Sequence, residues 1–280
     1  MILWPDTFTN HFDTEVGVAA VEALEDAGFR VVVPEGHLCC GRPLYDYGML
    51  SLAQRYLGRV LGALRAEIRA GVPVVGAEPS CVAVFKDELT KIRPLDEDAR
   101  RLSKQTFHLA EFLEQEGYRP PPLSRKVVLH EHCHQRATGG VAADRKLLEA
   151  MGAEVEVPDS GCCGMAGAWG YERGHYEVSE ACGERVLLPK VRAEANDSLI
   201  VTAGFSCRSQ IEQGTPRRAM HVAQAIQLAR DHGAEGPRGT FPELAVAPKP
   251  QPRASQRAAR AGVAAAVALA GAAALAATKR

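Results

Sequence analysis

Hydrophobic positions follow two alternating patterns along the chain, and the alternation occurs twice. Short apolar runs rich in β-branched residues, which are typical of buried strands, lie between longer stretches whose apolar residues recur at helical spacing. The strand-like runs are at 2–4, 31–33, 73–77, 126–129, 155–158 and 198–203. Strand and helix thus follow each other three times in each half, an order that indicates a parallel sheet covered by helices. We expect an α/β fold of two pseudo-repeated, Rossmann-like βαβαβα lobes.

The boundary between the lobes is predicted near residue 120. The segment 96–117 has apolar residues at helical spacing and ends in Gly117 before a run of prolines, so we expect one helix that links the lobes. This assigns 1–120 to the first cysteine-rich lobe with its linking helix and 121–233 to the second cysteine-rich lobe.

The last part of the chain, 234–280, has a different composition. It begins rich in proline, glycine and polar residues, which predicts a disordered tail, and continues into a run of Ala, Gly, Val and Leu at 261–277. That run is short for a membrane span, and alanine contributes little insertion energy. We expect a surface-associated or loosely helical tail, with membrane contact as the alternative.

Composition limits the class of protein. The 280 residues are 46% hydrophobic, which suffices for a sizeable core in one or two domains. A net charge of −1 without a basic stripe argues against a nucleic-acid partner. Because the chain is long and helix-rich, its cysteines indicate a reducing cytoplasm, with association at the inner membrane face as the alternative, rather than a secreted disulfide scaffold. A core strand starts at Ile2, so we also expect this chain to be a domain cut from, or encoded apart from, something larger.

Each half contains the rare motif Cys-Cys-Gly, at 39–41 and at 162–164. Adjacent cysteines cannot share one disulfide without strain, so a doubled motif points to thiolates gathered around metal. In the second half, one cysteine follows the first predicted strand, the pair follows the second, and another follows the third. The carboxyl ends of parallel strands lie on one edge of a sheet, so the four thiolates are expected to meet as a complete soft-metal ligand set. These residues are Cys133, Cys162, Cys163 and Cys207.

The first half departs from this pattern at one position. Cys39, Cys40 and Cys81 follow the second and third strands, but Phe8 stands roughly where Cys133 stands. Three thiolates remain, and a degenerate site without metal is an open alternative to a bound one. The candidates for a fourth ligand are His37, His11, water or a cluster sulfur.

Three histidines on one motif need a separate interpretation. The sequence HEHCH at 130–134 satisfies the zinc-protease pattern H-E-x-x-H, which requires both histidines on one helix face. It directly follows a predicted strand, so we do not expect a protease. His132 and His134 are expected either to flank the metal site and tune it or to lie on the surface. His108 is interpreted as a packing residue, with a place in the cleft between the lobes as the alternative, and Cys182 as a buried structural thiol.

Several longer phrases carry a family resemblance. The paired Cys-Cys-Gly units, HCHQ at 132–135 and the closing Ser-Cys of each half resemble the cysteine-rich (CCG) domain of the heterodisulfide reductase type. More closely, they resemble the carboxyl-terminal part of bacterial FAD-linked oxidases related to the glycolate oxidase iron–sulfur subunit and D-lactate dehydrogenase. The resemblance covers about residues 2–230.

The resemblance implies electron transfer. It assigns Cys133, Cys162, Cys163 and Cys207 to a [4Fe-4S] cluster, and Cys39, Cys40 and Cys81 to a second or vestigial site, where zinc with His37 nearby is an alternative. The family pattern closes each unit with C-x-x-C, whereas Glu78 and Gly204 stand at the earlier position here. The noncubane cluster and disulfide chemistry of heterodisulfide reductase are therefore not carried over.

Three functions remain as hypotheses. The first is an iron–sulfur electron-transfer module of a flavin-dependent 2-hydroxy acid oxidoreductase of the glycolate or D-lactate type. The chain contains no ferredoxin-type cysteine run and nothing that resembles a flavin domain, so FAD and ferredoxin-like segments are expected on a missing part or a partner subunit, and the chain alone is not expected to oxidise a substrate. The others are a zinc-stabilised interaction module and a thiol–disulfide reductase.

Overall fold

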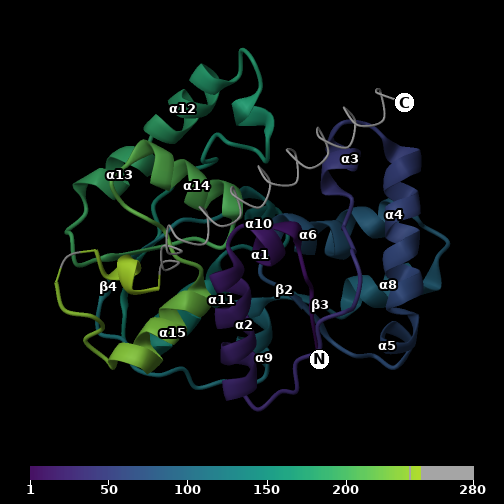
Figure 1. The fold of residues 1–280 in the computed structure, drawn as a ribbon, viewed down its shortest axis with the longest axis horizontal. Helices are drawn as coiled ribbons and strands as arrows, with labels where there is room; N and C mark the ends of the chain where they lie inside the picture. Colours follow the sequence, from purple (N-terminus) through teal and green to yellow (C-terminus); the bar gives the residue numbers. More distant parts are fainter. Residues whose placement is uncertain (240, 247–280) are drawn as a thin grey trace, which may run out of the picture. The chain divides into compact units, whose positions relative to one another are not determined.

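Two three-stranded parallel sheets organise the protein, one in each half (Figure 1). The computed structural model describes residues 1–239 and 241–246. The first sheet has the order β1 (Ile2–Leu3), β2 (Val74–Gly76), β3 (Thr106–His108). The second has the order β5 (Glu154–Glu156), β4 (Lys126–Leu129), β6 (Leu199–Val201). The expected α/β fold of two lobes with parallel sheets is confirmed.

A single bridge extends each sheet at one edge. Val32 pairs in parallel with Ile2, and Met220 pairs in parallel with Val201. With these bridges, both sheets have the same spatial order of their four segments: second, first, third, fourth. The predicted strand at 31–33 is thus reduced to one bridging residue, because Val32 and Val33 are about half exposed and pack against little on the outer side.

Helices connect and cover the strands in both lobes. The first lobe contains α1 (Thr7–His11), α2 (Thr14–Asp26), α3 (Arg42–Asp46), α4 (Leu50–Ala63), α5 (Arg65–Arg69), α6 (Pro79–Ala83), the π-helical turn η1 (Val84–Glu88), α7 (Leu89–Ile92), α8 (Glu97–Lys104) and α9 (Leu109–Gln115). The second contains α10 (Cys133–Ala137), α11 (Ala142–Ala150), the 3₁₀ turn η2 (Trp169–Tyr171), α12 (Tyr176–Glu184), α13 (Leu187–Ala193), α14 (Phe205–Gly214), α15 (Val222–His232) and the 3₁₀ turn η3 (Pro242–Ala245).

The single linking helix predicted over 96–117 is wrong. Asp96 caps α8 by accepting hydrogen bonds from Asp98 and Ala99, but the helix ends at Lys104. The next residues form β3, whose backbone pairs with β2, and α9 begins only after it. Helical spacing of the apolar residues did not reveal this strand because three residues are too few for an alternating pattern, and the pairing partner lies far earlier in the chain.

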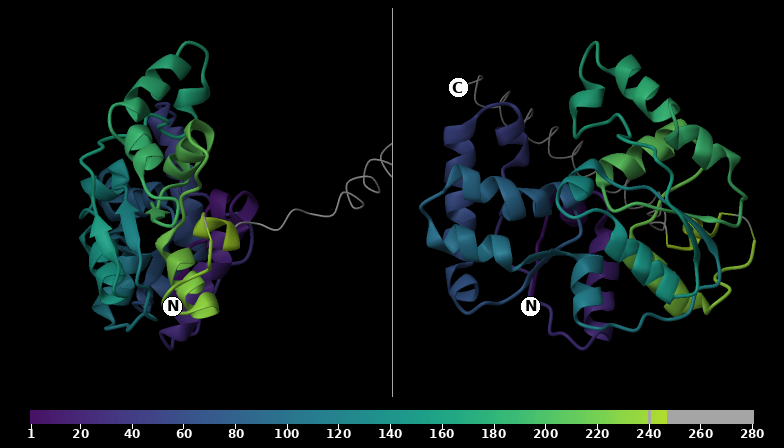
Figure 2. Two further views of the ribbon diagram at one scale, coloured as in Figure 1. Left: turned by 90° about the vertical axis from the view of Figure 1, so that its left-hand side faces the viewer. Right: turned by 180° about the vertical axis from the view of Figure 1, so that it is seen from behind.

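Alternate residues of each strand point to two different cores. Leu3 faces a central core and Ile2 faces an outer core of the first lobe, while Leu129 and Val128 divide in the same way in the second lobe. The central core is shared: it is lined by α2 and α9 from the first lobe and by α11 and α15 from the second, which lie side by side (Figures 1 and 2). Both sheets are therefore covered on both faces, and the lobes hold each other in place through buried apolar surface.

The segment after α15 differs from its prediction. Glu243 and Arg217 form an ion pair with Oε1–Nε at 2.7 Å, and their side chains are 1% and 2% exposed. Arg217 also lies over the ring of Phe241. The chain is thus packed against the second lobe up to residue 246, so the expected disordered tail does not begin at 234. The rest of that prediction, including the apolar run at 261–277, lies outside the described residues. Within 1–239 and 241–246, no helix has the length and apolar character needed to cross a membrane.

Candidate metal centre

The four predicted thiols of the second lobe meet at one edge of its sheet. Cys133 is the first residue of α10, Cys207 lies in the first turn of α14, and the adjacent pair lies in the loop after β5. Cys162 accepts hydrogen bonds from Cys133 and Cys163, and these contacts lower its pKa. The contact with Cys163 likewise lowers the pKa of Cys207. All are free cysteines, so the fold alone brings these four sulfurs together.

A glycine after each cysteine pair shapes the loop. Gly164 has a φ of +97°, and a Cβ there would lie 2.0 Å from the carbonyl oxygen of Ser179. Its N–H donates to Cys162 Sγ at 3.3 Å. Gly41 repeats the arrangement, with a φ of +81° and its N–H 3.4 Å from Cys39 Sγ. The left-handed φ favours glycine at both positions, and at Gly164 the close approach of Ser179 excludes a side chain as well, which explains the repeated Cys-Cys-Gly motif.

The first lobe gathers three thiols at the equivalent place. Cys40 and Cys81 are buried with their sulfurs 3.0 Å apart. The pKa of Cys39 is raised, and the largest cause is a hydrogen bond with Cys40. The position that would complete the set is occupied by Thr7, because Thr7 begins α1 just as Cys133 begins α10, each four residues after its strand ends. The expectation that Phe8 takes this position is wrong.

Phe8 instead contributes to the contact between the lobes. Its ring stacks on that of Phe205 at a centroid distance of 4.2 Å, and both rings also approach Phe12. Phe205 begins α14, the helix that carries Cys207. The aromatic side chain therefore holds the two cysteine-bearing edges together without entering either sulfur cluster.

The two histidines considered for the first site lie at its margin. His37 and His11 are both exposed, although the charge of His37 acts to lower the pKa of Cys39. Buried carboxylates lie closer to the centre. The pKa of Cys81 is raised: the hydrogen bond with Cys40 opposes the rise, whereas burial and the charges of Asp6 and Glu78 produce it.

Two residues stand where the family pattern has a cysteine, Glu78 and Gly204. Each has a structural role. Glu78 caps α6 through Ser80, and its second oxygen accepts the backbone N–H of Phe205 at 2.8 Å. Gly204 leaves room for His132: a Cβ at this position would lie 1.9 Å from the His132 ring. The imidazole therefore fills the space that a cysteine side chain would need.

The histidines of 130–134 do not form a protease site. His130 follows β4 directly and is fully buried, while His134 lies within α10, so they do not share one helix face. His132 caps α10 by accepting the His134 N–H at 3.2 Å. Burial lowers the pKa of His134 to about 4. The donor atoms of His132, Cys133 and His134 lie within 4.8 Å of one another, which places both histidines beside the thiols.

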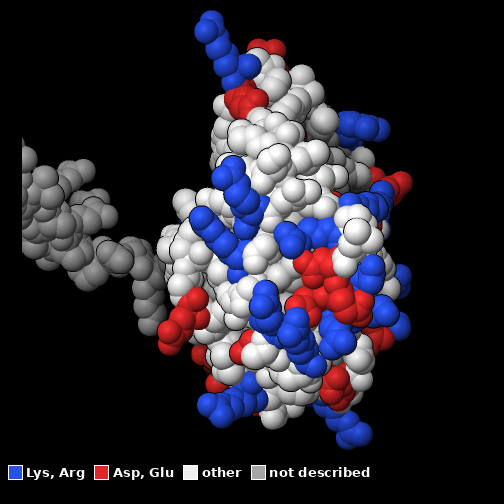
Figure 3. Space-filling model, turned by 90° about the vertical axis from the view of Figure 1, so that its right-hand side faces the viewer, with Lys and Arg blue, Asp and Glu red and all other residues white. Residues whose placement is uncertain are grey.

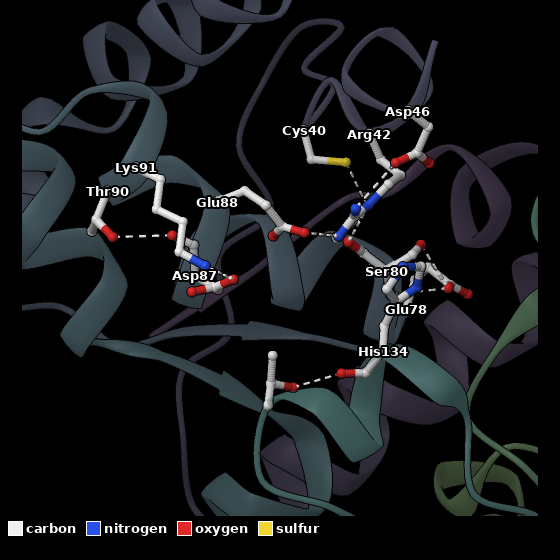
Figure 4. Close-up of polar contacts among 12 residues, drawn as sticks. Cys40, Arg42, Asp46, Glu78, Ser80, Asp87, Glu88, Thr90, Lys91 and His134 are labelled. Atoms are coloured by element: carbon white, nitrogen blue, oxygen red, sulfur yellow. Dashed lines mark hydrogen bonds and ion pairs between the residues drawn. The ribbon is translucent and has the colours of Figure 1, made fainter. Parts of the chain in front are cut away.

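A buried arginine next to the first cysteine pair escaped the sequence interpretation. Arg42 pairs with Glu88 at 2.7 Å and Asp46 at 3.2 Å, and it donates to the carbonyl oxygen of Ser80 (Figure 4). It thereby ties the Cys-Cys-Gly loop to η1 and to α6, the helix that carries Cys81. The sequence signal for this role was the position of Arg42 directly after the glycine of the first Cys-Cys-Gly motif. Elsewhere both signs of charge are mixed: acidic and basic side chains are interspersed on the face shown in Figure 3. Arg69, Arg93 and Arg100 pair with Asp98, Asp96 and Glu97 respectively.

The donor set of the second lobe fits a soft metal or an iron–sulfur cluster. Four cysteine sulfurs converge there, two of them buried, and thiolates are the ligands that zinc and iron–sulfur clusters share. A buried ring nitrogen, His130 Nε2, lies in the same region with no hydrogen-bond partner among the described residues. Such an unpartnered polar atom beside the thiols fits a site built for a charged group.

Comparisons with known proteins give the same two-part organisation. The family model described as "Cysteine-rich domain" matches residues 7–86 and 127–212. The chain is 30% identical over 229 residues to one subunit of the anaerobic glycerol-3-phosphate dehydrogenase of Escherichia coli (strain K12), covering 78% of this chain and 57% of that subunit. It is 27% identical to the D-2-hydroxyglutarate dehydrogenase of Pseudomonas putida, covering 81% of this chain and 22% of that enzyme. It is 31% identical to the lactate utilization protein A of Geobacillus kaustophilus, covering 77% of this chain and 93% of that protein.

Proposed function

The chain belongs to the cysteine-rich domain family, of which it carries two copies, and we propose that it is the iron–sulfur electron-transfer module of a flavin-dependent 2-hydroxy acid oxidoreductase. The observation that carries this proposal is the convergence of four thiols in the second lobe. Cys133, Cys162, Cys163 and Cys207 are the residues that would hold a [4Fe-4S] cluster. Such a cluster, when bound, supplies one-electron transfer.

The surroundings of these thiols suit that task. Cys163 and Cys207 are buried beneath the sheet edge, whereas Cys133 and Cys162 are exposed. The buried pair keeps water away from one side of the site, and the exposed pair leaves the other side open to an electron-transfer partner. The fully buried His130 and the capping His132 complete a low-dielectric wall behind the sulfurs.

The relatives support the kind of enzyme. The names of those reported above include dehydrogenases of glycerol 3-phosphate and of D-2-hydroxyglutarate and a protein of lactate utilization. The chain spans only 57% of the length of the glycerol-3-phosphate dehydrogenase subunit it matches. We infer that flavin and ferredoxin-like segments reside on another part of the protein or on a partner subunit in the cytoplasm, and that a 2-hydroxy acid of the glycolate or D-lactate type is oxidised there.

The three thiols of the first lobe form a separate proposed site. Cys39, Cys40 and Cys81 would hold zinc or a second cluster, and the exposed His37 is the nearby candidate nitrogen ligand. Because Thr7 stands where the second lobe has Cys133, this site offers one thiolate fewer. We therefore assign the redox role to the second lobe and a mainly structural role to the first.

Anaerobic reconstitution with iron and sulfide tests the proposal. The loaded protein should be brown, with a broad visible absorption that dithionite bleaches. Cys163→Ser should abolish the part of this absorption that comes from the second lobe, while Cys40→Ser should leave that part unchanged. A colourless protein that binds stoichiometric zinc and no iron would favour the zinc-stabilised interaction module instead.

A further inference from the structure

Equivalent positions in the two lobes place a ring nitrogen beside a cysteine. Trp4 and His130 each come directly after the first strand of their sheet, and their backbone N–H groups donate to Val75 at 2.8 Å and Val201 at 2.9 Å. The Trp4 side chain is 1% exposed and that of His130 is 0% exposed. Trp4 Nε1 and His130 Nε2 both lack a hydrogen-bond partner among the described residues. A buried donor without a partner costs about 1–3 kcal/mol, so its repetition in both lobes calls for an acceptor.

The orientation of each ring is fixed by its neighbours. His130 Nδ1 lies 2.6 Å from Ser160 Oγ, whereas the alternative acceptor of that hydroxyl, the Pro158 carbonyl oxygen, is 3.4 Å away. We assign the hydroxyl proton of Ser160 to the shorter contact, so that Nδ1 accepts it and Nε2 carries the ring proton. In the first lobe, the edge-to-face contact of Trp4 with Phe85, at 4.7 Å between ring centroids, holds the indole in place.

Each ring also lies beside the cysteine of the third strand's helix. The contact with Cys163 is the largest influence that lowers the pKa of Cys207, and the His130 side chain acts in the same direction. In the first lobe, Cys40 is the largest influence that lowers the pKa of Cys81, and the Trp4 side chain acts in the same direction, although burial and nearby carboxylates raise that pKa overall. The two lobes thus repeat one contact between a ring and a cysteine with two different side chains. A shared requirement for an N–H donor beside this cysteine explains the repetition.

We propose that His130 donates its Nε2–H to the sulfur of Cys207 in the metal-loaded protein and thereby raises the reduction potential of the second-lobe site. This inference rests on the proposed function. An added electron increases the negative charge on the ligand sulfurs, and an N–H donor stabilises that charge. The donor therefore stabilises the reduced form more than the oxidised form. His130 is a positioning residue here, since it acts through Cys207.

Redox titration of the reconstituted protein, followed by low-temperature EPR, tests this role. His130→Phe keeps a flat ring but removes the donor, and it should shift the reduced-to-oxidised ratio at a fixed potential about tenfold toward the oxidised form, which is ~59 mV for one electron. His130→Gln retains an N–H donor and should recover most of the shift. His175→Phe is the matched control, because His175 lies outside the cysteine cluster, stacked on Trp169, and should leave the potential unchanged.

The outcomes separate this inference from the proposed function. A His130→Phe protein with wild-type iron content and wild-type potential overturns the role of His130. If that variant loses iron, pulsed EPR of the wild type with ¹⁵N-labelled histidine shows whether the hydrogen bond is present. A weak nitrogen coupling that disappears in His130→Gln supports a hydrogen bond, and an unchanged coupling pattern contradicts it. Failure of the wild type to bind iron would instead refute the proposed function itself.

Discussion

The carboxylate of Glu78 accepts the backbone N–H of Phe205 at 2.8 Å, across 127 residues of sequence. Its other oxygen caps α6, the helix of Cys81, while Phe205 begins α14, the helix of Cys207. One buried side chain thus fixes the starts of both helices that bring a cysteine from the third strand of each lobe. The two groups of cysteines are therefore held at fixed positions relative to each other by a side chain that stands where the family pattern has a cysteine.

Replacing Glu78 should destabilise the protein. Glu78→Ala removes a helix cap and leaves two partly buried N–H groups unpaired, which is expected to reduce the free energy of unfolding by about 2–4 kcal/mol. Urea denaturation of the metal-loaded protein measures this. The control is Glu97→Ala, whose exposed pair with Arg100 is expected to contribute less than about 1 kcal/mol. Equal effects of the two substitutions would contradict the role assigned to Glu78.

Gly204 should tolerate no side chain. Gly204→Ala places a methyl group against the His132 ring and should displace it, at a cost of about 1–3 kcal/mol or more and with loss of metal from the second lobe. Gly62→Ala is the matched control: it lies within α4 with no atom within 4 Å of the added Cβ, and should stabilise by about 0.5–1 kcal/mol. Thermal unfolding with metal analysis compares them. A Gly204→Ala protein with normal metal content would refute the packing argument.

The ion pair of Arg217 with Glu243 tests where the folded unit ends. Arg217→Met leaves the Glu243 carboxylate buried and unpaired, so we expect a loss of about 3–5 kcal/mol. The exposed pair of Arg218 with Glu212 provides the comparison, and Arg218→Met should cost under about 1 kcal/mol. Chemical denaturation of both variants distinguishes them. A small effect at Arg217 would mean that residues 241–246 do not belong to the packed structure.

His108 should make stability depend on pH. Its pKa is lowered from 6.5 to about 3, first by burial and then by the charges of Lys86 and His132, so the folded protein keeps it neutral. The unfolded chain takes up a proton below about pH 6.5 and the folded protein does not until about pH 3, so stability falls as the pH falls through this window, by at most about 1.4 kcal/mol per unit.

Comparison with His108→Asn isolates this contribution. Asp144, whose pKa is raised from 3.8 to about 7 by burial, acts with the opposite sign in the same window, because the unfolded chain releases its proton first as the pH rises. The difference in unfolding free energy between wild type and His108→Asn should therefore change between pH 7 and pH 4. The contribution of Asp144 is the same in both proteins and cancels in this difference. A pH-independent difference would contradict a neutral, buried His108. Its Nε2 also contacts Thr138 in the second lobe, so the packing and cleft interpretations both describe it.

The sequence predicted what depends on strand ends and missed what depends on contacts between the lobes. Cysteines that follow three parallel strands must meet, and they do. The central core, the Glu78 contact and the fit of His132 against Gly204 involve residues far apart in sequence, and no local pattern encodes them. Asp6 is a capping residue and so marks Thr7 as the first helical position, which places Thr7 rather than Phe8 at the equivalent of Cys133.

Iron and acid-labile sulfide content per chain, measured after anaerobic reconstitution, shows whether the four thiols of the second lobe hold an iron–sulfur cluster. Cys163→Ser removes one of the four converging thiols, and Cys182→Ser removes a cysteine that lies on α12 outside that set. We expect iron and sulfide in equal amounts in the wild type and in Cys182→Ser, and a loss of both from the second lobe in Cys163→Ser. Equal iron in the two variants, or zinc in place of iron in all three proteins, would contradict it.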